Sequence, residues 1–249
     1  MSSFQIFTSA ELASLRQAGK ILAACLEEVA SRVTPGITTG ELDQIAEDFI
    51  RSHDGASPAF KGYQNYPSTL CTSVNEQCVH GLPGPRVLDE GDIVSLDCGV
   101  LVDGLYTDAC ITVGVGVITT EHQLFLDVTA DALAKACAIV KPGTRIGDIS
   151  SVIQKTVEAA GYKPVRGLTG HGLGYTLHQF PDVPNAGKAG TGPALPVGTI
   201  IAIEPITSMG GPDIADAEDG WTIQTKDGSL SAHFEHTVLV TENGQEILA

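Results

Sequence analysis

The chain has 249 residues, 43% of them hydrophobic, and a formal net charge of −16. This is enough chain to bury one large core, and it is too apolar for a disordered protein. The negative charge argues against direct nucleic-acid binding, which needs a basic face, and it suits a protein that holds cations.

The apolar residues follow helical and strand periods in an order that indicates an α+β fold. In chain order, the expected elements are helices over 8–32 and 39–53, strands over 70–80, 92–99 and 105–113, helices over 121–138 and 146–160, and strands over 165–171, 199–207, 220–226 and 232–241. Short connections near 100–105 and 227–231 favour antiparallel hairpins. No linker is biased enough in composition to divide the chain, so we expect one domain over 1–249.

The sequence predicts neither export nor a membrane span. The amino terminus lacks a basic-then-apolar signal pattern, and no apolar run approaches the length of a spanning helix. The cysteines form no CxxC pair and no zinc-ribbon spacing, which fits free thiols in a reducing compartment. They are Cys25, Cys71, Cys78, Cys98, Cys110 and Cys137. We therefore expect a cytoplasmic protein.

Two pairs of segments repeat at a separation of 107 residues. Residues 33–42 match 140–149 at four of ten positions, and residues 88–97 match 195–204 at three identical and four similar positions. Because both pairs share one offset, we expect two related halves, about 10–115 and 116–249, packed about a pseudo-two-fold axis. The alignment places Asp97 on Glu204, so equivalent strand ends would aim both carboxylates at the interface between the halves.

Asp97 and Asp108 flank Asp103-Gly104, a strong signal for a hairpin turn. A two-residue turn puts Asp97 opposite Cys110, one step along the same face from Asp108. Shifting the turn by one residue pairs the aspartates directly, whereas a three-residue loop would put them on opposite faces. Adjacent carboxylates repel each other, and a cation between them or a raised pKa removes the conflict. The alternative is a pair of solvated strand acids.

Two glutamates are further candidate metal ligands. Glu204 ends an apolar strand, where an unpaired buried carboxylate costs several kcal/mol, and it is the repeat partner of Asp97. Glu235 lies in a strongly β segment and shares one face with His233 and Thr237. His236, on the other face, is a structural or supporting candidate.

Two histidines beside glycines complete the candidate site. His171 stands between Gly170 and Gly172, which favours a loop with close backbone approach and an uncovered ring. His80 has a similar His-Gly arrangement in the first half. Two Asp, two Glu and one His favour Mn²⁺, Fe²⁺, Co²⁺ or Zn²⁺ in an open catalytic site. Four carboxylates are too many for one small ion, so we expect two bridged ions roughly 3.5–4 Å apart.

These residues, in this order, resemble the type I methionine aminopeptidases, over nearly the whole chain. The matching stretches are Tyr66-Pro, Ser73-Val-Asn-Glu, Val79-His-Gly, Asp97-Cys-Gly, Tyr106-Thr-Asp, Gly170-His-Gly-Leu-Gly, Ala202-Ile-Glu-Pro and Phe234-Glu-His-Thr. Prolidases and aminopeptidase P share the metal-ligand pattern alone. The His80 motif, the Trp221 region and the short chain distinguish the methionine aminopeptidases. The resemblance implies the pita-bread fold, in which two related halves carry antiparallel sheet and outer helices.

The resemblance also implies a role for each matching residue. It assigns the metals to Asp97, Asp108, His171, Glu204 and Glu235. It assigns contacts with the substrate and its scissile amide to His80 and His178, and it places Tyr63, Tyr66, Cys71 and Trp221 around the methionine pocket. Two positions depart from the family pattern. Phe60 replaces a common pocket-wall cysteine and Leu177 a common phenylalanine, and we hypothesise that the two offset each other in volume. The stretch after His178 is also less usual, and the type II insertion and the zinc-binding amino-terminal extension are missing.

The implied reaction is removal of the initiator methionine from nascent chains whose second residue is small. We expect the ions to lower the pKa of a bridging water, giving a hydroxide, with Glu204 accepting its proton and passing it to the leaving amine. His178 or His80 would stabilise the charge on the tetrahedral intermediate. Nascent polypeptide amino termini are the expected partners, the ribosome is a candidate partner, and a monomer is expected. The alternatives are a proline-directed peptidase on the same fold, a non-catalytic binding protein, and a metal-storage protein.

Overall fold

The computed structural model describes residues 3–249, so Met1 and Ser2 of the predicted domain lie outside the described residues. The four predicted helices are confirmed, with every end within two residues of the prediction. They are α1 (Ser9–Ser31), α2 (Thr39–Arg51), α3 (Thr120–Ala138) and α4 (Ile146–Ala159). Thr8 and Thr38 begin the first two helices with capping boxes, in which each hydroxyl accepts a hydrogen bond from the backbone of a glutamate three residues later. Among the described residues, no helix has the length and apolarity to span a bilayer.

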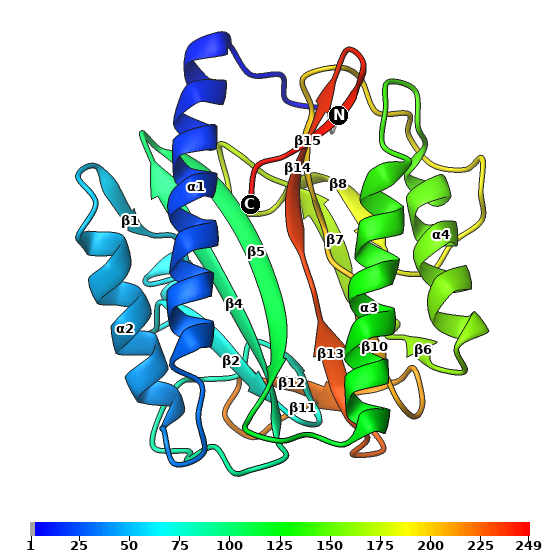
Figure 1. Ribbon diagram of the computed structural model, residues 1–249. Coiled ribbons are helices and arrows are strands. Elements are labelled where there is room, and N and C mark those ends of the chain that lie inside the picture. Colours follow the sequence, from blue (N-terminus) through cyan, green and yellow to red (C-terminus); the bar gives the residue numbers. More distant parts are fainter. Residues whose placement is uncertain (1–2) are drawn as a thin grey trace.

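The first sheet is antiparallel and lies against α1 and α2 (Figure 1). Its strands are β1 (Ala56–Pro58), β2 (Leu70–Val74), β4 (Ile93–Val102) and β5 (Leu105–Gly114). The long strand β4 pairs with β5, and it also pairs with both β1 and β2. The apolar faces of the two helices and of this sheet form one core cluster, which includes Leu22, Leu42 and Leu96.

The second large sheet is also antiparallel and lies against α3 and α4 (Figure 1). Its strand order is β15 (Gly244–Ile247), β14 (His236–Thr241), β9 (Ile200–Ile203), β7 (Thr169–Gly172) and β8 (Gln179–Pro184). A second core cluster, which includes Ile149, Ile153 and Ile203, fills the space between this sheet and its helices. The predicted α+β architecture with antiparallel hairpins is therefore confirmed.

Two small sheets join the large ones at one end of the molecule, and a 3₁₀ helix covers Tyr63–Asn65. One small sheet contains β6 (Lys163–Pro164), β10 (Ile206–Ser208) and β13 (Ser231–His233). The other contains β3 (Gln77–Val79), β11 (Ile214–Asp216) and β12 (Ile223–Thr225).

Three of the predicted strands are wrong as continuous elements. The segment 70–80 turns at Asn75, whose φ is 57°, so it forms β2 and β3. The segments 199–207 and 232–241 also divide into two strands each. Glu204 and Glu235 lie at two of the breaks, where the chain leaves one sheet for another. The predictions over 165–171 and 220–226 shorten to β7 and β12, and the short strands β1, β6, β8, β11 and β15 were not predicted.

The segments that repeat in the sequence make the same backbone contacts in both halves. Gly36 donates to Leu88 O over 2.8 Å, and 107 residues later Gly143 donates to Leu195 O over 2.8 Å. The isolated bridges Thr38–Val87 and Arg145–Ala194 are related by the same separation. In each half, the loop before a helix therefore docks on the segment that leads into the central strand.

Candidate metal centre and adjoining pocket

The hairpin of β4 and β5 places two aspartates on one face. Val102 pairs with Leu105 across the two-residue turn Asp103-Gly104, so Asp97 pairs with Cys110 and Gly99 with Asp108. This is the first of the predicted registers, and it puts the two carboxylates one step apart. Asp97 is 8% exposed and Asp108 is 4% exposed, which excludes the interpretation as solvated strand acids.

The second half presents two glutamates and a histidine to the same place. Glu204 follows the end of β9, and Glu235 lies between β13 and β14, where its backbone N–H donates to Cys110 O of the first half over 2.9 Å. His171 lies on β7. A Cβ added at Gly170 or Gly172 would lie 2.4 Å or less from a backbone oxygen, so the predicted close approach is confirmed. His171 itself is on a strand, although the flanking glycines had favoured a loop.

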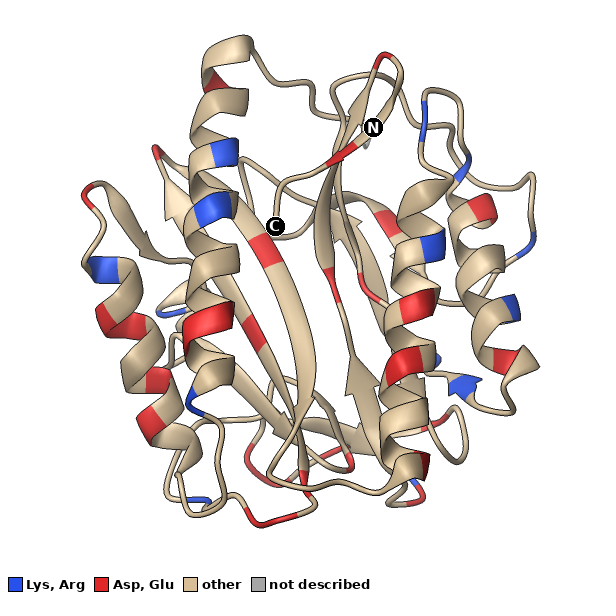
Figure 2. Cartoon of the chain, in the orientation of Figure 1, with Lys and Arg blue, Asp and Glu red and all other residues tan. Residues whose placement is uncertain are grey.

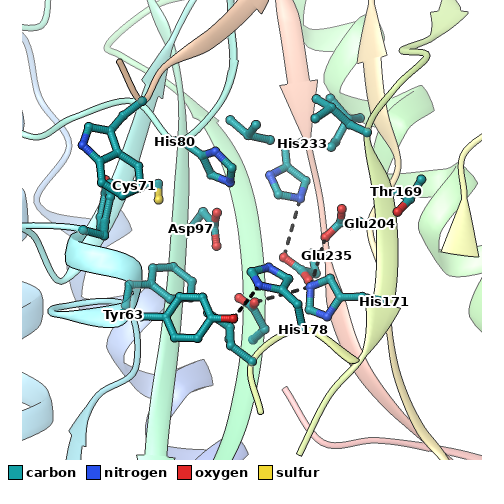
Figure 3. A pocket seen from close by; sticks show the side chains of 18 of the residues that line it. Tyr63, Cys71, His80, Asp97, Thr169, His171, His178, Glu204, His233 and Glu235 are labelled. Carbon is teal, nitrogen blue, oxygen red and sulfur yellow. Dashed lines mark hydrogen bonds and ion pairs between the residues drawn. The ribbon is translucent and has the colours of Figure 1, made fainter. Parts of the chain in front are cut away.

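The side chains of Asp97, His171, Glu204 and Glu235 converge on one centre (Figure 3). His171 Nε2 lies 3.9 Å from Asp108 Oδ2 and 3.9 Å from Glu204 Oε2. Ligand atoms of Asp108, His171 and Glu235 lie within 4.8 Å of one another, which is a spacing that one ion can bridge. Asp97 belongs to no such group among the described residues, but it lines the same cavity.

The donor set fits divalent ions. One carboxylate oxygen each of Asp97, Asp108 and Glu235 is buried without a hydrogen-bond partner within residues 3–249. Burial raises the pKa of Asp97 to about 7, and it holds the pKa values of Asp108, Glu204 and Glu235 well above their usual range. A cluster of buried, unpartnered carboxylates is costly unless cations or protons neutralise it. Burial also lowers the pKa of His171 to about 3, so its ring is neutral and able to bind a metal at neutral pH.

A cavity of about 210 Å³ adjoins the carboxylates, and its other walls are apolar and aromatic. Every residue that the sequence indicated as a site residue lines it. Besides the five candidate metal ligands, these are Phe60, Tyr63, Tyr66, Cys71, His80, His178 and Trp221. Tyr66 and Trp221 meet edge to face with centroids 5.1 Å apart, and His178 Nδ1 lies 3.3 Å from the Tyr63 hydroxyl.

The model of metallopeptidase family M24 matches residues 13–242. The chain belongs to metallopeptidase family M24. Within the family it falls among the type I methionine aminopeptidases, as the following similarities show. It is 48% identical over 238 residues to the methionine aminopeptidase of Clostridium perfringens, covering 96% of this chain and 95% of the relative. It is 44% identical over 241 residues to methionine aminopeptidase 1 of Bacillus subtilis, covering 97% of both chains.

Solved structures confirm the fold of this M24 peptidase. The methionine aminopeptidase of Thermotoga maritima superposes with a TM-score of 0.97 at 44% identity, covering 99% of both chains. The prolidase of Pyrococcus furiosus superposes with a TM-score of 0.79 at 22% identity, covering 98% of this chain and 64% of the other, and shows the fold alone. The predicted pita-bread fold is confirmed. Membership of M24 also makes the protein a hydrolase that uses divalent metal.

Some polar residues of the M24 site were not selected from the sequence. His233 and Thr169 both line the cavity. The alternation along 232–240 had placed His233 on the face of Glu235, but alternation alone does not separate a site histidine from a structural one. His236, on the other face, is structural, since its Nδ1 lies 2.8 Å from Ala249 O.

Proposed function

We propose that this M24 peptidase removes the initiator methionine from nascent proteins whose second residue is small. The observation that carries the proposal is the cavity, in which a cluster of buried carboxylates adjoins an apolar pocket. With a volume of about 210 Å³, the cavity is large enough for one amino-acid side chain. Relatives at 44–48% identity carry the name methionine aminopeptidase, which supports the same conclusion.

We assign two divalent ions, of Co, Mn, Fe or Zn, to the carboxylate cluster. The ligands would be Asp97, Asp108, His171, Glu204 and Glu235. The negative charge of four ionised carboxylates balances the positive charge of two divalent ions. Both halves of the chain contribute ligands to the set. Bound there, such ions would polarise the scissile carbonyl and lower the pKa of the attacking water.

Three side chains are placed to move protons and to stabilise charge. Glu204 is buried and its pKa is raised, so it can take a proton from the attacking water and return it to the leaving amine. Burial lowers the pKa values of His80 and His178, so both rings are neutral donors near neutral pH. The hydroxyl of Tyr63 helps to orient the His178 ring, which can then donate to the developing oxyanion.

The apolar walls of the cavity would hold the methionine side chain. Aromatic rings and a thiol make a polarisable surface that suits a thioether. Phe60 and Leu177 belong to one packed cluster with Tyr66 and Cys71, which supports the idea that their volumes offset each other. Gly99 leaves room for the Phe60 ring, because a Cβ at position 99 would lie 2.7 Å from Phe60 Cε1.

We further propose that the protein acts as a cytoplasmic monomer on nascent amino termini, with the ribosome as a candidate partner. All six cysteines are free and buried, which fits a reducing compartment. Acidic side chains outnumber basic ones along the helices (Figure 2), so direct nucleic-acid binding is not part of the proposal.

The test is hydrolysis of Met-Ala-Ser, Met-Leu-Ser and Ala-Pro-Ala by EDTA-treated protein, with Co²⁺, Mn²⁺, Fe²⁺ or Zn²⁺ restored singly. We expect metal-dependent release of methionine, faster from Met-Ala-Ser, abolished in Asp97→Ala and unchanged in the matched surface variant Asp54→Ala. Cleavage before proline would move the protein to the prolidase branch. No cleavage with any metal would favour a binding protein that kept the fold.

A further inference from the structure

His233 is a histidine whose ring is buried beside Glu235. The residue is 2% exposed, and neither Nδ1 nor Nε2 makes a hydrogen bond to any residue that the structure describes. A buried imidazole normally satisfies at least one of its nitrogens. In Figure 3, the ring lies between His80 and Glu204 and is turned toward Glu235, inside the cavity.

The backbone of His233, in contrast, is fully engaged. Its N–H donates to Thr112 Oγ1 over 2.9 Å, and its carbonyl accepts from the same hydroxyl over 2.7 Å. The carbonyl also accepts from Cys110 Sγ over 3.4 Å, and the residue pairs with Ile206 in the small sheet. These backbone contacts therefore fix the position of His233, and its ring nitrogens, which make no hydrogen bond among the described residues, face the carboxylates.

The spacing around the ring is that of a metal site. His233 Nε2 lies 3.5 Å from Glu235 Oε2, and these atoms together with one from Glu204 lie within 4.8 Å of one another. Two ligands held about 2.1 Å from one ion at a tetrahedral angle are about 3.4 Å apart, which matches the first distance. The same distance is long for a hydrogen bond between an imidazole and a carboxylate.

We propose that His233 Nε2 is a sixth protein ligand, binding the ion that Glu204 and Glu235 hold. This rests on the proposed two-ion site and extends it. Asp108, His171 and Glu235 make one ligand group, Glu204, His233 and Glu235 make another, and Glu235 bridges them. Two imidazoles would then serve the two ions, an average of one per ion. The second imidazole shifts the preference of the site toward Co²⁺ and Zn²⁺ relative to Mn²⁺, because imidazole nitrogen suits those ions better.

The first test needs no variant. In X-ray absorption of the wild-type protein loaded with two equivalents of Co²⁺, we expect about one imidazole per ion. If His171 is the only histidine ligand, the average falls to about half an imidazole per ion, and the proposal for His233 is wrong. Binding of fewer than two ions would instead contradict the proposed two-ion site, so the two failures are distinguishable.

The second test compares His233→Gln with His236→Gln, a histidine three residues along whose Nδ1 lies 2.8 Å from Ala249 O. By titration calorimetry, we expect His233→Gln to weaken one of the two Co²⁺ sites at least about 100-fold and to halve the imidazole signal. His236→Gln should bind both ions as the wild type does. Equal affinities and spectra for the two variants would overturn the proposal, with far-UV circular dichroism reporting that both are folded.

Discussion

The buried carboxylates make the metal-free protein sensitive to pH. Burial raises the pKa of Asp97 to about 7, against about 3.9 in an unfolded chain, and it also holds the pKa values of Asp108, Glu204 and Glu235 well above their usual range. Over the window between the two pKa values, the folded state holds protons that the unfolded state releases. The free energy of unfolding of the metal-free protein therefore falls as pH rises through this window.

The buried histidines act in the opposite sense at lower pH. Burial lowers the pKa values of His171 and His233 to about 3, so the unfolded state binds more protons below about pH 6.5. Stability from this source is present above about pH 6.5 and is lost as pH falls below it. Only above about pH 6.5 does the pH dependence of the free energy of unfolding reflect the carboxylates without the histidines.

We therefore predict that the melting temperature of EDTA-treated protein falls between about pH 6.5 and pH 8.5. The protein saturated with Co²⁺ should show a flat or rising curve, since the ion takes the place of the protons. Differential scanning fluorimetry across this range measures both curves. Asp97→Asn removes one of the titrating groups, so it should flatten the metal-free curve. Parallel curves with and without metal would contradict the prediction.

At the scale of elements, two threonine hydroxyls join the halves of the chain. They hydrogen-bond to backbone groups where a continuous sheet would have backbone-to-backbone hydrogen bonds. Thr237 Oγ1 on β14 accepts from Asp108 N over 2.9 Å and donates to Asp108 O over 2.6 Å. Thr112 on β5 makes the same pair of bonds with the backbone of His233. The bridge between Cys110 and Glu235 lies between them. Residues that present the candidate metal ligands are thus joined directly across the two halves.

We predict that Thr237→Val destabilises the protein by about 2–5 kcal/mol, because it leaves the buried N–H and C=O of Asp108 unpaired. For a chain of this size, that corresponds to a fall in melting temperature of roughly 5–15 °C. Metal affinity should fall as well, since Asp108 loses its anchor. Thr237→Ser keeps the hydroxyl and should lie close to the wild type. A melting temperature for Thr237→Val equal to that of Thr237→Ser would show that the hydroxyl does not join the sheets.

The elements that could be predicted from the sequence are those with a local cause. The helical spacing of the apolar residues predicted the helices, and Asp103-Gly104 predicted the turn that aligns the two aspartates. The broken strands could not be predicted. Glu235 leaves one sheet for another because it pairs with Cys110, more than a hundred residues away, and nothing local marks that pairing.

The candidate site was predictable for a related reason. Asp97 and Glu204 stood out because the repeat placed one on the other, and the resemblance supplied the pocket residues. His233 was visible on the Glu235 face, but only its unpartnered ring and its distance to the carboxylates distinguish it. Both features depend on the tertiary structure, so a local sequence pattern cannot reveal them.

At the scale of the whole molecule, we propose that residues 1–249 form one domain of two related halves, about 10–115 and 116–249. The equivalent contacts of Gly36 and Gly143 support the relation between the halves. The candidate ligands come from both: Asp97 and Asp108 from the first, the other three from the second. A core cluster also spans the two, packing Leu15 and Leu105 with Ile200 and Leu239.

Because the two halves share a core cluster and the candidate ligand set, we predict one cooperative unfolding transition, with or without metal. Far-UV circular dichroism, which reports the helices of both halves, should coincide with the fluorescence of Trp221, which reports the cavity. An ion at 100 times its Kd adds about 2.7 kcal/mol, so two ions should raise the single transition by roughly 10–20 °C. If the halves were independent, neither would hold a complete ligand set after its partner unfolded. The trace would then divide into two steps, the first of them releasing the metal.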